Sequence, residues 1–590
     1  MREPNAKQAK MGQAATIRKF RIPVCIFLLA LVASLVGCWW GIPQLNGPTT
    51  PPHGWEVDAT SGLATLSELH NLFIEPKPDW YMAYPVFHYL VQGLAYLPYL
   101  AMLFVTGELS HPSPVYPYGL KDPASAIASM VLISRVLTAI MSAATLTLVY
   151  LIGKKVWDSA TGLIATAALG LTSVFVYYSH TSNLDIPVLF WSVATLFVIT
   201  DALIAGLDAR RAIAAGTLAG LAVATKDQAY GALAVGLLGL VFFHWRRCLR
   251  EHSVSTRFWR PSRFLVGAGA FSYIAASLLW WSPQRFAGHF QFVANFQKTF
   301  FNVIHLATLR PPTMAGYADL GLDMLDCATE AMSPAFFLLA VYGAVRGVRS
   351  SAFIKVLLAM MAGQLILTVI PLHHMMYRYI LFVAVGLALL GAHGFMLAWR
   401  ANRPQRIVAA CLALAGFTWL LVSATDTVYQ LVRDSRGQAS HWLASNLGGG
   451  NLVGFFGSPD QLPHIPGGNV VQRAPLGRAL VTTWIDRRQP AMLIVAADFS
   501  SRSNGARAPF NETGKEHSVF LPDEVYTQLL DGSLGYDLAA EFRTASLTGR
   551  ALKFLPWVNP PVKLFQRRQR ATGAASAVTN GQIAATVQPR

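Results

Sequence analysis

Apolar runs long enough to cross a membrane recur along the first 424 residues of this sequence. Clear examples are 186–204 and 380–398, each about as long as the 20-residue helix that spans the roughly 30 Å hydrocarbon core of a bilayer. The chain is 53% hydrophobic and only 13% charged, whereas charged residues make up about 25% of an average soluble domain. The sequence therefore predicts an α-helical polytopic membrane protein.

About eleven transmembrane helices are expected from the positions of these runs. They lie near 21–41, 125–152, 159–178, 186–204, 213–225, 228–243, 264–282, 324–346, 353–371, 380–398 and 407–424. The segments 213–225 and 228–243 are each too short to cross comfortably, which predicts a hairpin bent at Lys226 and Asp227 with its tip near the outer face.

The formal net charge of +17 does not indicate a nucleic-acid partner. The basic residues cluster in short loops between apolar runs, where the positive-inside rule accounts for them. The inner loops hold Lys154, Lys155, Arg210, Arg211, Arg349, Arg400, Arg403, Arg406 and the basic run at 244–263. This pattern predicts a multi-pass membrane protein with a cytoplasmic N-terminus. The short outer domain, in place of a large inserted lumenal one, indicates a bacterial plasma membrane.

Two further segments are expected to lie at the outer surface. The run 86–107 is long enough to span, but if it did, every later basic loop would fall outside. We therefore expect it to lie on, or re-enter, the outer surface. The aromatic loop 283–323 is expected to hold an interfacial helix that covers a site.

The composition divides the chain into four parts. Residues 1–20 form a cytoplasmic N-terminus, and 21–424 form the transmembrane domain, whose first outer loop is 42–82. Residues 425–570 are richer in charge, Gly and Pro, and predict a soluble extracytoplasmic α/β domain with short strands in 470–484 and 491–499. The small, polar tail 571–590 is expected to be disordered.

Ionisable groups within or beside the apolar runs are the functional candidates, because they are costly in a membrane. Glu56 and Asp58 lie in the first outer loop, Asp185 precedes an apolar run, Arg135 lies inside one, and Lys226 lies at the hairpin tip. The expected topology gathers them on the outer side. The structural alternatives are that Asp185 is a helix N-cap, that Arg135 snorkels or pairs with a carboxylate, and that Lys226 is an interfacial anchor.

The order of six motifs resembles a known family of membrane enzymes. The motifs are WEVDA (55–59), YPVFHYL (84–90), Arg135 followed by YLIGKKVW (150–157), YSHTSNLDIPVLFW (178–191), GLAVATKDQAYGAL (220–233) and MYRYILFVAVGLALLGA (376–392). In this order they resemble the GT-C class of glycosyltransferases, especially the family 39 protein O-mannosyltransferases and the aminoarabinose transferases of lipid A. Two motifs depart from the family, because Val57 separates the two acids and YPP is replaced by YPV.

The resemblance implies a GT-C fold and the transfer of a sugar from a polyprenyl-phosphate-linked donor to an acceptor hydroxyl of a protein, lipid or glycan. Transfer would occur on the outer face with inversion. Asp58 aligns with the expected general base, with Glu56 and Asp185 as the other catalytic candidates. Candidates for binding the donor phosphate are Arg135, Lys226 and Arg378, and candidates for substrate binding are Tyr84, His88 and His180.

No essential cofactor is expected beyond the lipid-linked donor. His373 and His374 are adjacent and so do not form a helical chelating pair, and no HExxH, CxxC, Walker A or GxGxxG motif occurs. A divalent metal would be possible, but no motif supports one. The competing interpretations are a secondary transporter and a GT-C-fold assembly factor that has lost its activity.

Overall fold

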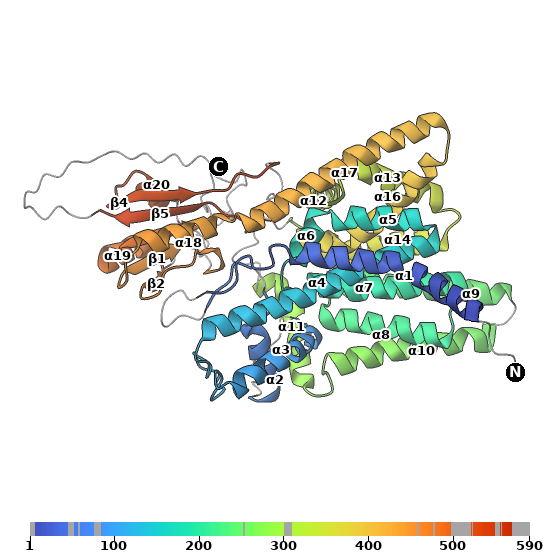
Figure 1. Cartoon of the computed structure of the whole chain (residues 1–590), viewed down its shortest axis with the longest axis horizontal. Helices are drawn as coiled ribbons and strands as arrows, with labels where there is room; N and C mark the ends of the chain where they lie inside the picture. The colour runs from blue at the N-terminus through green and yellow to red at the C-terminus, as the bar shows by residue number, and fades with distance from the viewer. Residues whose placement is uncertain are drawn as a thin grey trace, which may run out of the picture.

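The computed structural model shows a long helical bundle followed by a small domain built on a sheet (Figure 1). It describes residues 6–44, 52–56, 59–75, 84–251, 254–299, 310–456, 459–475, 478–496, 521, 523–548, 555 and 557–568. The N-terminus and the sheet lie at opposite ends of the long axis (Figure 1). This arrangement confirms the prediction of a mostly helical polytopic protein with a small C-terminal α/β domain.

Within the described ranges, seven helices are long and apolar enough to cross a membrane, or up to nine if each of two bent pairs is one span. The seven are α3 (Phe87–Val105), α4 (Pro123–Val156), α7 (Asp185–Ala205), α9 (Ala229–Arg250), the segment Ala352–Leu372 that begins with α14 (Ala352–Gln364), the segment Tyr377–Trp399 that contains α16 (Leu381–Trp399), and the segment Arg403–Asn446 that begins with α17 (Arg403–Val432).

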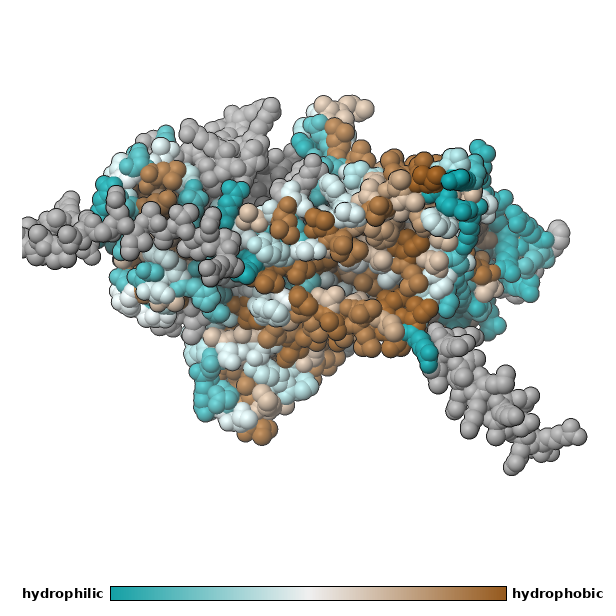
Figure 2. Space-filling model, turned by 45° about the horizontal axis from the view of Figure 1, so that its top comes forward, coloured by the Kyte–Doolittle hydropathy of each residue, from teal (hydrophilic) through white to brown (hydrophobic). Residues whose placement is uncertain are grey.

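Fewer helices meet these criteria than the eleven expected. The apolar part of α1 (Ala6–Leu35) covers only Arg21–Leu35, and α8 (Ala209–Thr225) has 17 residues. By contrast α9, expected to be too short, has 22 residues because it continues into the basic run. Figure 2 shows a hydrophobic band over the bundle, between more hydrophilic surfaces at its two ends, as expected for a multi-pass membrane protein.

Two of the predicted single spans are broken helices. The span predicted at 159–178 consists of α5 (Ser159–Gly170) and α6 (Ser173–Ser179), bent by 70°. The span predicted at 324–346 consists of α12 (Met314–Met332) and α13 (Pro334–Gly347), bent by 103°. The prediction of continuous helices was wrong here, because the side chains of Thr172 and Ser333 cap the second helix of each pair.

The helix α4 is central to the first part of the bundle. It contacts α1, α5 and α7, while α8 packs between α7 and α10 (Val254–Ala276), and α13 packs against α16 and α17. At the end of the bundle nearer the sheet (Figure 1), α2 (Leu63–Phe73) and α3 contact each other, and Arg285 of α11 (Pro283–Thr299) donates to the Asn71 carbonyl of α2. A helix in the loop 283–323 was predicted, and α11 is that helix.

The C-terminal domain is a five-stranded mixed sheet with the strand order β2-β1-β3-β5-β4. The strands β1 (Leu452–Phe456), β2 (Val470–Arg473) and β3 (Met492–Ala496) are parallel, and β5 (Val562–Arg567) is antiparallel to both β3 and β4 (Tyr536–Phe542). The helices α18 (Ser435–Asn446), α19 (Arg478–Arg488) and α20 (Asp523–Leu530) accompany it.

Two boundaries of this domain differ from expectation. The strand predicted at 470–484 ends at Arg473, because its second half forms α19. The last long helix, α17, continues past residue 424 to Val432 before α18 begins. The strand predicted at 491–499 is β3, whose residues Met492–Ala496 are all buried.

Candidate active site

The loop between α1 and α2 is closely packed where the structure describes it. The Trp55 amide donates to the Gly41 carbonyl at 3.0 Å. Gly41 has φ of +54°, and a Cβ atom there would lie 2.5 Å from the Cβ of Trp55. Only glycine fits both the backbone conformation and the contact. This packing fixes Trp40, Trp55 and Glu56 next to α4.

Glu56 and Arg135 form a buried ion pair. Arg135, in α4, places Nη2 3.2 Å from Glu56 Oε2, and the two side chains are 1% and 3% exposed. Its Nη1 also donates to the carbonyl oxygens of Cys38, at 2.7 Å, and Trp40. Ser182 completes the cluster, since its amide donates to Glu56 Oε1 at 2.6 Å and its hydroxyl to Oε2 at 2.9 Å.

This geometry gives both residues partners within the protein, and the roles predicted for them stay predictions. Glu56, a predicted catalytic candidate, uses both carboxylate oxygens inside the protein. Arg135, predicted to bind the donor phosphate, is paired with Glu56 and with two loop carbonyls. Glu56 lies close enough to neutralise the guanidinium, so the pair ties the first loop to α4 and to the turn before α7.

Asp185 and Lys226 form a second buried ion pair. Lys226, which follows α8, places Nζ 2.7 Å from Asp185 Oδ1, and the side chains are 3% and 6% exposed. The Lys226 ammonium also lies 5.5 Å from the centroid of the Tyr84 ring, a cation–π contact. Asp185 is not the N-cap, because α7 begins at Asp185 and Leu184 occupies the cap position.

The second carboxylate oxygen of Asp185 is the unusual atom of this pair. Oδ2 is buried and accepts no hydrogen bond from the described part of the protein. An unsatisfied buried polar atom costs about 1–3 kcal/mol, and more when it is charged. Because Lys226 neutralises the other oxygen, Oδ2 is positioned to accept a hydrogen bond from a bound molecule.

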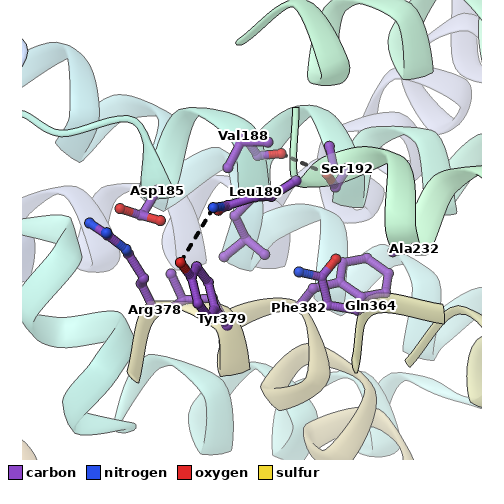
Figure 3. Close-up of a pocket in the computed structure, with 12 residues that line it drawn as sticks. Asp185, Val188, Leu189, Ser192, Ala232, Gln364, Arg378, Tyr379 and Phe382 are labelled. Carbon is purple, nitrogen blue, oxygen red and sulfur yellow. Dashed lines mark hydrogen bonds between the residues drawn. The ribbon is translucent and has the colours of Figure 1, made fainter. Parts of the chain in front are cut away.

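Asp185 lies at one end of a cavity of about 400 Å³, a volume that includes open solvent. Figure 3 shows the Asp185 and Arg378 side chains turned toward each other at that end. Gln228 and Tyr379 also line this cavity, and Gln228 Nε2 donates to the Tyr379 hydroxyl at 3.5 Å. Polar groups for orienting a ligand therefore converge in a cavity that also has aliphatic and aromatic walls.

A second cavity, of about 410 Å³ with open solvent included, is lined by Leu72 and residues 84–86 and by residues between 277 and 289. Tyr84, Arg285 and His289 line it. His289, in α11, places Nε2 2.9 Å from Oδ2 of Asp227, the residue after Lys226. Gln228 lines the first cavity, whereas Lys226 and Asp227 only contact Tyr84 and His289, which line the second. Arg285 and His289 place α11 on one side of the second cavity.

The remaining predicted residues have different outcomes. Asp58, the predicted base, lies outside the described residues. His88 and His180 line neither cavity. His88 is fully buried at the start of α3, and His180 follows α6 with its Nδ1 2.6 Å from the Val176 carbonyl oxygen. Tyr84 and Arg378, in contrast, do line the cavities.

The sequence reasoning missed several polar residues of these cavities, among them Gln228, Arg285, His289 and Gln364. Gln228 lies two positions after Lys226 within the motif GLAVATKDQAYGAL, so that motif could have indicated it. His289 lies in the aromatic loop that was expected to cover a site. Gln364, at the end of α14, had no local signal, because it is one amide within an apolar run.

Among the residues that the structure describes, no group of three or more His, Cys, Asp or Glu side chains could hold a metal ion. Independence of a metal stays an expectation from the sequence.

The C-terminal domain contacts the first loop, between α1 and α2, through His464. The His464 ring stacks on Trp55, with centroids 4.8 Å apart. Burial, and then the positive charge of Arg436, lower the pKa of His464 to about 4, against the opposing charge of Asp434. The neutral imidazole is therefore the form that fits between the domain and the loop.

We expect this contact to weaken on acidification. Between about pH 6.5 and pH 4 the unfolded chain binds a proton at His464 that the folded chain excludes. The free energy of unfolding therefore falls as the pH drops through this window, by up to roughly 3 kcal/mol. Thermal unfolding at pH 7 and pH 4.5 measures this loss of stability. His464→Phe should reduce the loss, whereas His441→Phe, at an exposed position of α18, should leave it as large as in the wild type. An equal loss in the wild type and His464→Phe would contradict this.

The comparisons with known proteins agree with the motif order. Residues 110–280 match the sequence model of the dolichyl-phosphate-mannose-protein mannosyltransferase family, which is less than a third of the chain. No curated protein matches the chain. The matched region contains Arg135, Asp185 and Lys226. It supports a membrane glycosyltransferase of the GT-C class.

Several solved structures show a looser likeness. ArnT from Cupriavidus metallidurans, bound to undecaprenyl phosphate, is 14% identical, with a TM-score of 0.43 over 92% of this chain and 97% of that one. The oligosaccharyltransferase AglB from Archaeoglobus fulgidus is 12% identical, with a TM-score of 0.43 over 93% and 89%. The arabinofuranosyltransferase AftD from Mycobacteria is 14% identical, with a TM-score of 0.41 over 94% and 42%.

Proposed function

We propose that this protein transfers a sugar from a polyprenyl-phosphate-linked donor to an acceptor hydroxyl. The observation that carries the proposal is the buried Asp185–Lys226 pair, which brings an unsatisfied carboxylate oxygen to the cavity that Arg378 lines. A transferase of this kind needs cations for a phosphate leaving group and acceptors for sugar hydroxyls. The match to a mannosyltransferase family over the region that supplies this pair supports the same chemistry.

The leaving phosphate would bind between Lys226 and Arg378. Negative charge develops on the phosphate as the glycosidic bond breaks, and fixed cations in a site shielded from water stabilise it. The Lys226 ammonium would be shared between Asp185 and the phosphate. Oδ2 of Asp185 would accept a hydrogen bond from a sugar hydroxyl and so orient the donor.

The acceptor hydroxyl needs a base, and the motif alignment assigns this role to Asp58. Of the other two acidic candidates, Glu56 is occupied by Arg135 and Ser182, and Asp185 by Lys226. A single displacement from the side opposite the phosphate inverts the anomeric carbon. The second cavity, beyond Lys226, would admit the acceptor.

The membrane setting completes the proposal. A polyprenyl chain reaches the site only from the bilayer, so the donor would enter between helices of the bundle. We propose that the reaction takes place on the outer face of a bacterial plasma membrane, with the C-terminal domain on the same side. The acceptor class, whether protein, lipid or glycan, is to be determined by assay.

Replacing Asp58 by asparagine should abolish sugar transfer without unfolding the protein. The amide cannot take the hydroxyl proton, so the rate should fall by about 10²–10⁴-fold. Transfer of a radiolabelled sugar by the purified protein measures this. Asp319→Asn, at an exposed carboxylate 3.9 Å from Arg310, is the matched control and should keep full activity. Full transfer by a folded Asp58→Asn variant would rule out Asp58 as the base.

A further inference from the structure

We infer that the C-terminal domain positions the first loop of the proposed transferase site, through a buried arginine–aspartate pair, Arg436 and Asp434. The inference rests on the proposed function only for its effect on catalysis. The contacts themselves join three parts of the chain that are far apart in sequence: the domain, the loop between α1 and α2, and the helix α4.

Arg436, in the first turn of α18, is fully buried. Its Nε and Nη2 donate to the two carboxylate oxygens of Asp434, at 2.9 and 2.6 Å, in a bidentate arrangement. Nη1 donates to the Asp460 carbonyl at 2.8 Å and Nη2 to the Trp557 carbonyl at 3.1 Å. The guanidinium is therefore held in one orientation by the domain alone.

The face of this guanidinium contacts the two tryptophans of the first loop. Arg436 Cζ lies 4.8 Å from the centroid of the Trp55 ring and 5.6 Å from that of Trp40. The Trp40 indole also donates to Asp434 Oδ2 at 3.0 Å. Both members of the buried pair thus contact the loop, and the loop meets a rigid, charged surface.

The same two tryptophans connect the domain to the Glu56–Arg135 pair. The Trp40 carbonyl accepts a hydrogen bond from Arg135 Nη1, and the Arg135 guanidinium lies 5.7 Å from the Trp40 ring centroid. Trp55 immediately precedes Glu56, and its backbone amide donates to the Gly41 carbonyl. Trp40 therefore contacts one buried arginine from the domain and one from α4.

A second contact keeps the domain from rotating about this point. The Trp557 indole donates to the Tyr177 hydroxyl, in α6, at 2.7 Å. Asn559 donates from its backbone to Asp434 Oδ2 at 3.0 Å and accepts from the Ser435 amide at 2.8 Å. Apolar packing alone could attach a domain, whereas a directional set of polar contacts defines one orientation.

The prediction is that loosening Arg436 frees the loop. Arg436→Met removes both the ion pair and the flat cation, and Arg436→Lys keeps the charge but loses the bidentate geometry and the stacking. The matched control is Arg433→Met, because Arg433 is exposed only three residues away.

Hydrogen–deuterium exchange of the purified protein is the first readout, because it does not depend on any activity. Peptides that contain residues 52–56, including the Trp55 amide, should exchange about tenfold faster in Arg436→Met than in the wild type or in Arg433→Met. Peptides from α7 and α16, in the bundle interior, should be unchanged.

Transfer kinetics are the second readout. A displaced loop should lower kcat by about 10–100-fold, with the KM for the donor within about twofold, and Arg436→Lys should fall between the wild type and Arg436→Met. If Arg436→Met does not fold, the comparison of Arg436→Lys with the wild type decides.

Unchanged exchange at 52–56 in a folded variant would overturn the inference, as would an equal increase throughout the bundle. Faster exchange confined to the loop supports the inference even if the wild type transfers no sugar. The absence of transfer would contradict the proposed function but not the role of Arg436.

Discussion

Replacing Arg135 by methionine should destabilise the protein by about 3–5 kcal/mol and abolish its activity. The substitution leaves the Glu56 carboxylate, 3% exposed, without its only cation within ion-pair distance among the described residues. It also removes the donor to the Cys38 and Trp40 carbonyls, which anchors the first loop to α4. The thermal unfolding midpoint of the detergent-purified variant measures the loss.

The paired substitution distinguishes charge from packing. Arg135→Met combined with Glu56→Gln removes both charges, and so should recover much of the stability that the single change loses. Transfer should stay low in the double variant, because the loop still lacks its anchors. If the single variant is as stable as the wild type, the pair does not hold the loop.

Replacing Lys226 by methionine should destabilise the protein by a comparable amount and should also abolish transfer. Asp185 would keep two buried carboxylate oxygens and lose its cation, at a cost of about 3–5 kcal/mol. The double variant Asp185→Asn, Lys226→Met should recover stability but not transfer, because the proposed phosphate contact is gone. Transfer and unfolding are both measured on the same preparation.

A surface pair provides the control for this comparison. Lys155 and Asp201 form an ion pair with side chains 34% and 25% exposed, and Arg211 also contacts Asp201. Lys155→Met should therefore change stability by less than about 1 kcal/mol and leave transfer intact. Recovery of transfer in the Asp185→Asn, Lys226→Met double variant would show that the pair is only structural.

The sequence predicted much of the helical architecture, because each membrane helix has a local signal. An apolar run such as 186–204 needs no partner to be recognised, and α7 occupies almost the same residues, Asp185–Ala205. The breaks at Thr172 and Ser333 were missed because a capping hydroxyl gives the same sequence signal as an ordinary small residue. The helix α19 was missed because the β-branched and aromatic residues at 481–485 favour a strand.

The charged residues of the site were predicted individually, but their pairing was not. Glu56 and Arg135 are 79 positions apart, and Asp185 and Lys226 are 41 apart. Nothing in the sequence says which acid meets which base. The resemblance grouped Arg135 with the phosphate-binding residues, whereas the packing of the first loop brings Glu56 to it. The contact of Arg436 with Trp40 and Trp55 likewise depends on how the domain folds against the loop.

The most direct test of the central claim is to measure the release of polyprenyl phosphate by the purified wild-type protein from a panel of polyprenyl-phosphate sugars, with candidate acceptors present. The account predicts that at least one donor releases polyprenyl phosphate in a one-to-one ratio with sugar transferred. No release from any donor by a folded protein, whatever the acceptor, would contradict it and would favour a transporter or an inactive relative of the GT-C enzymes.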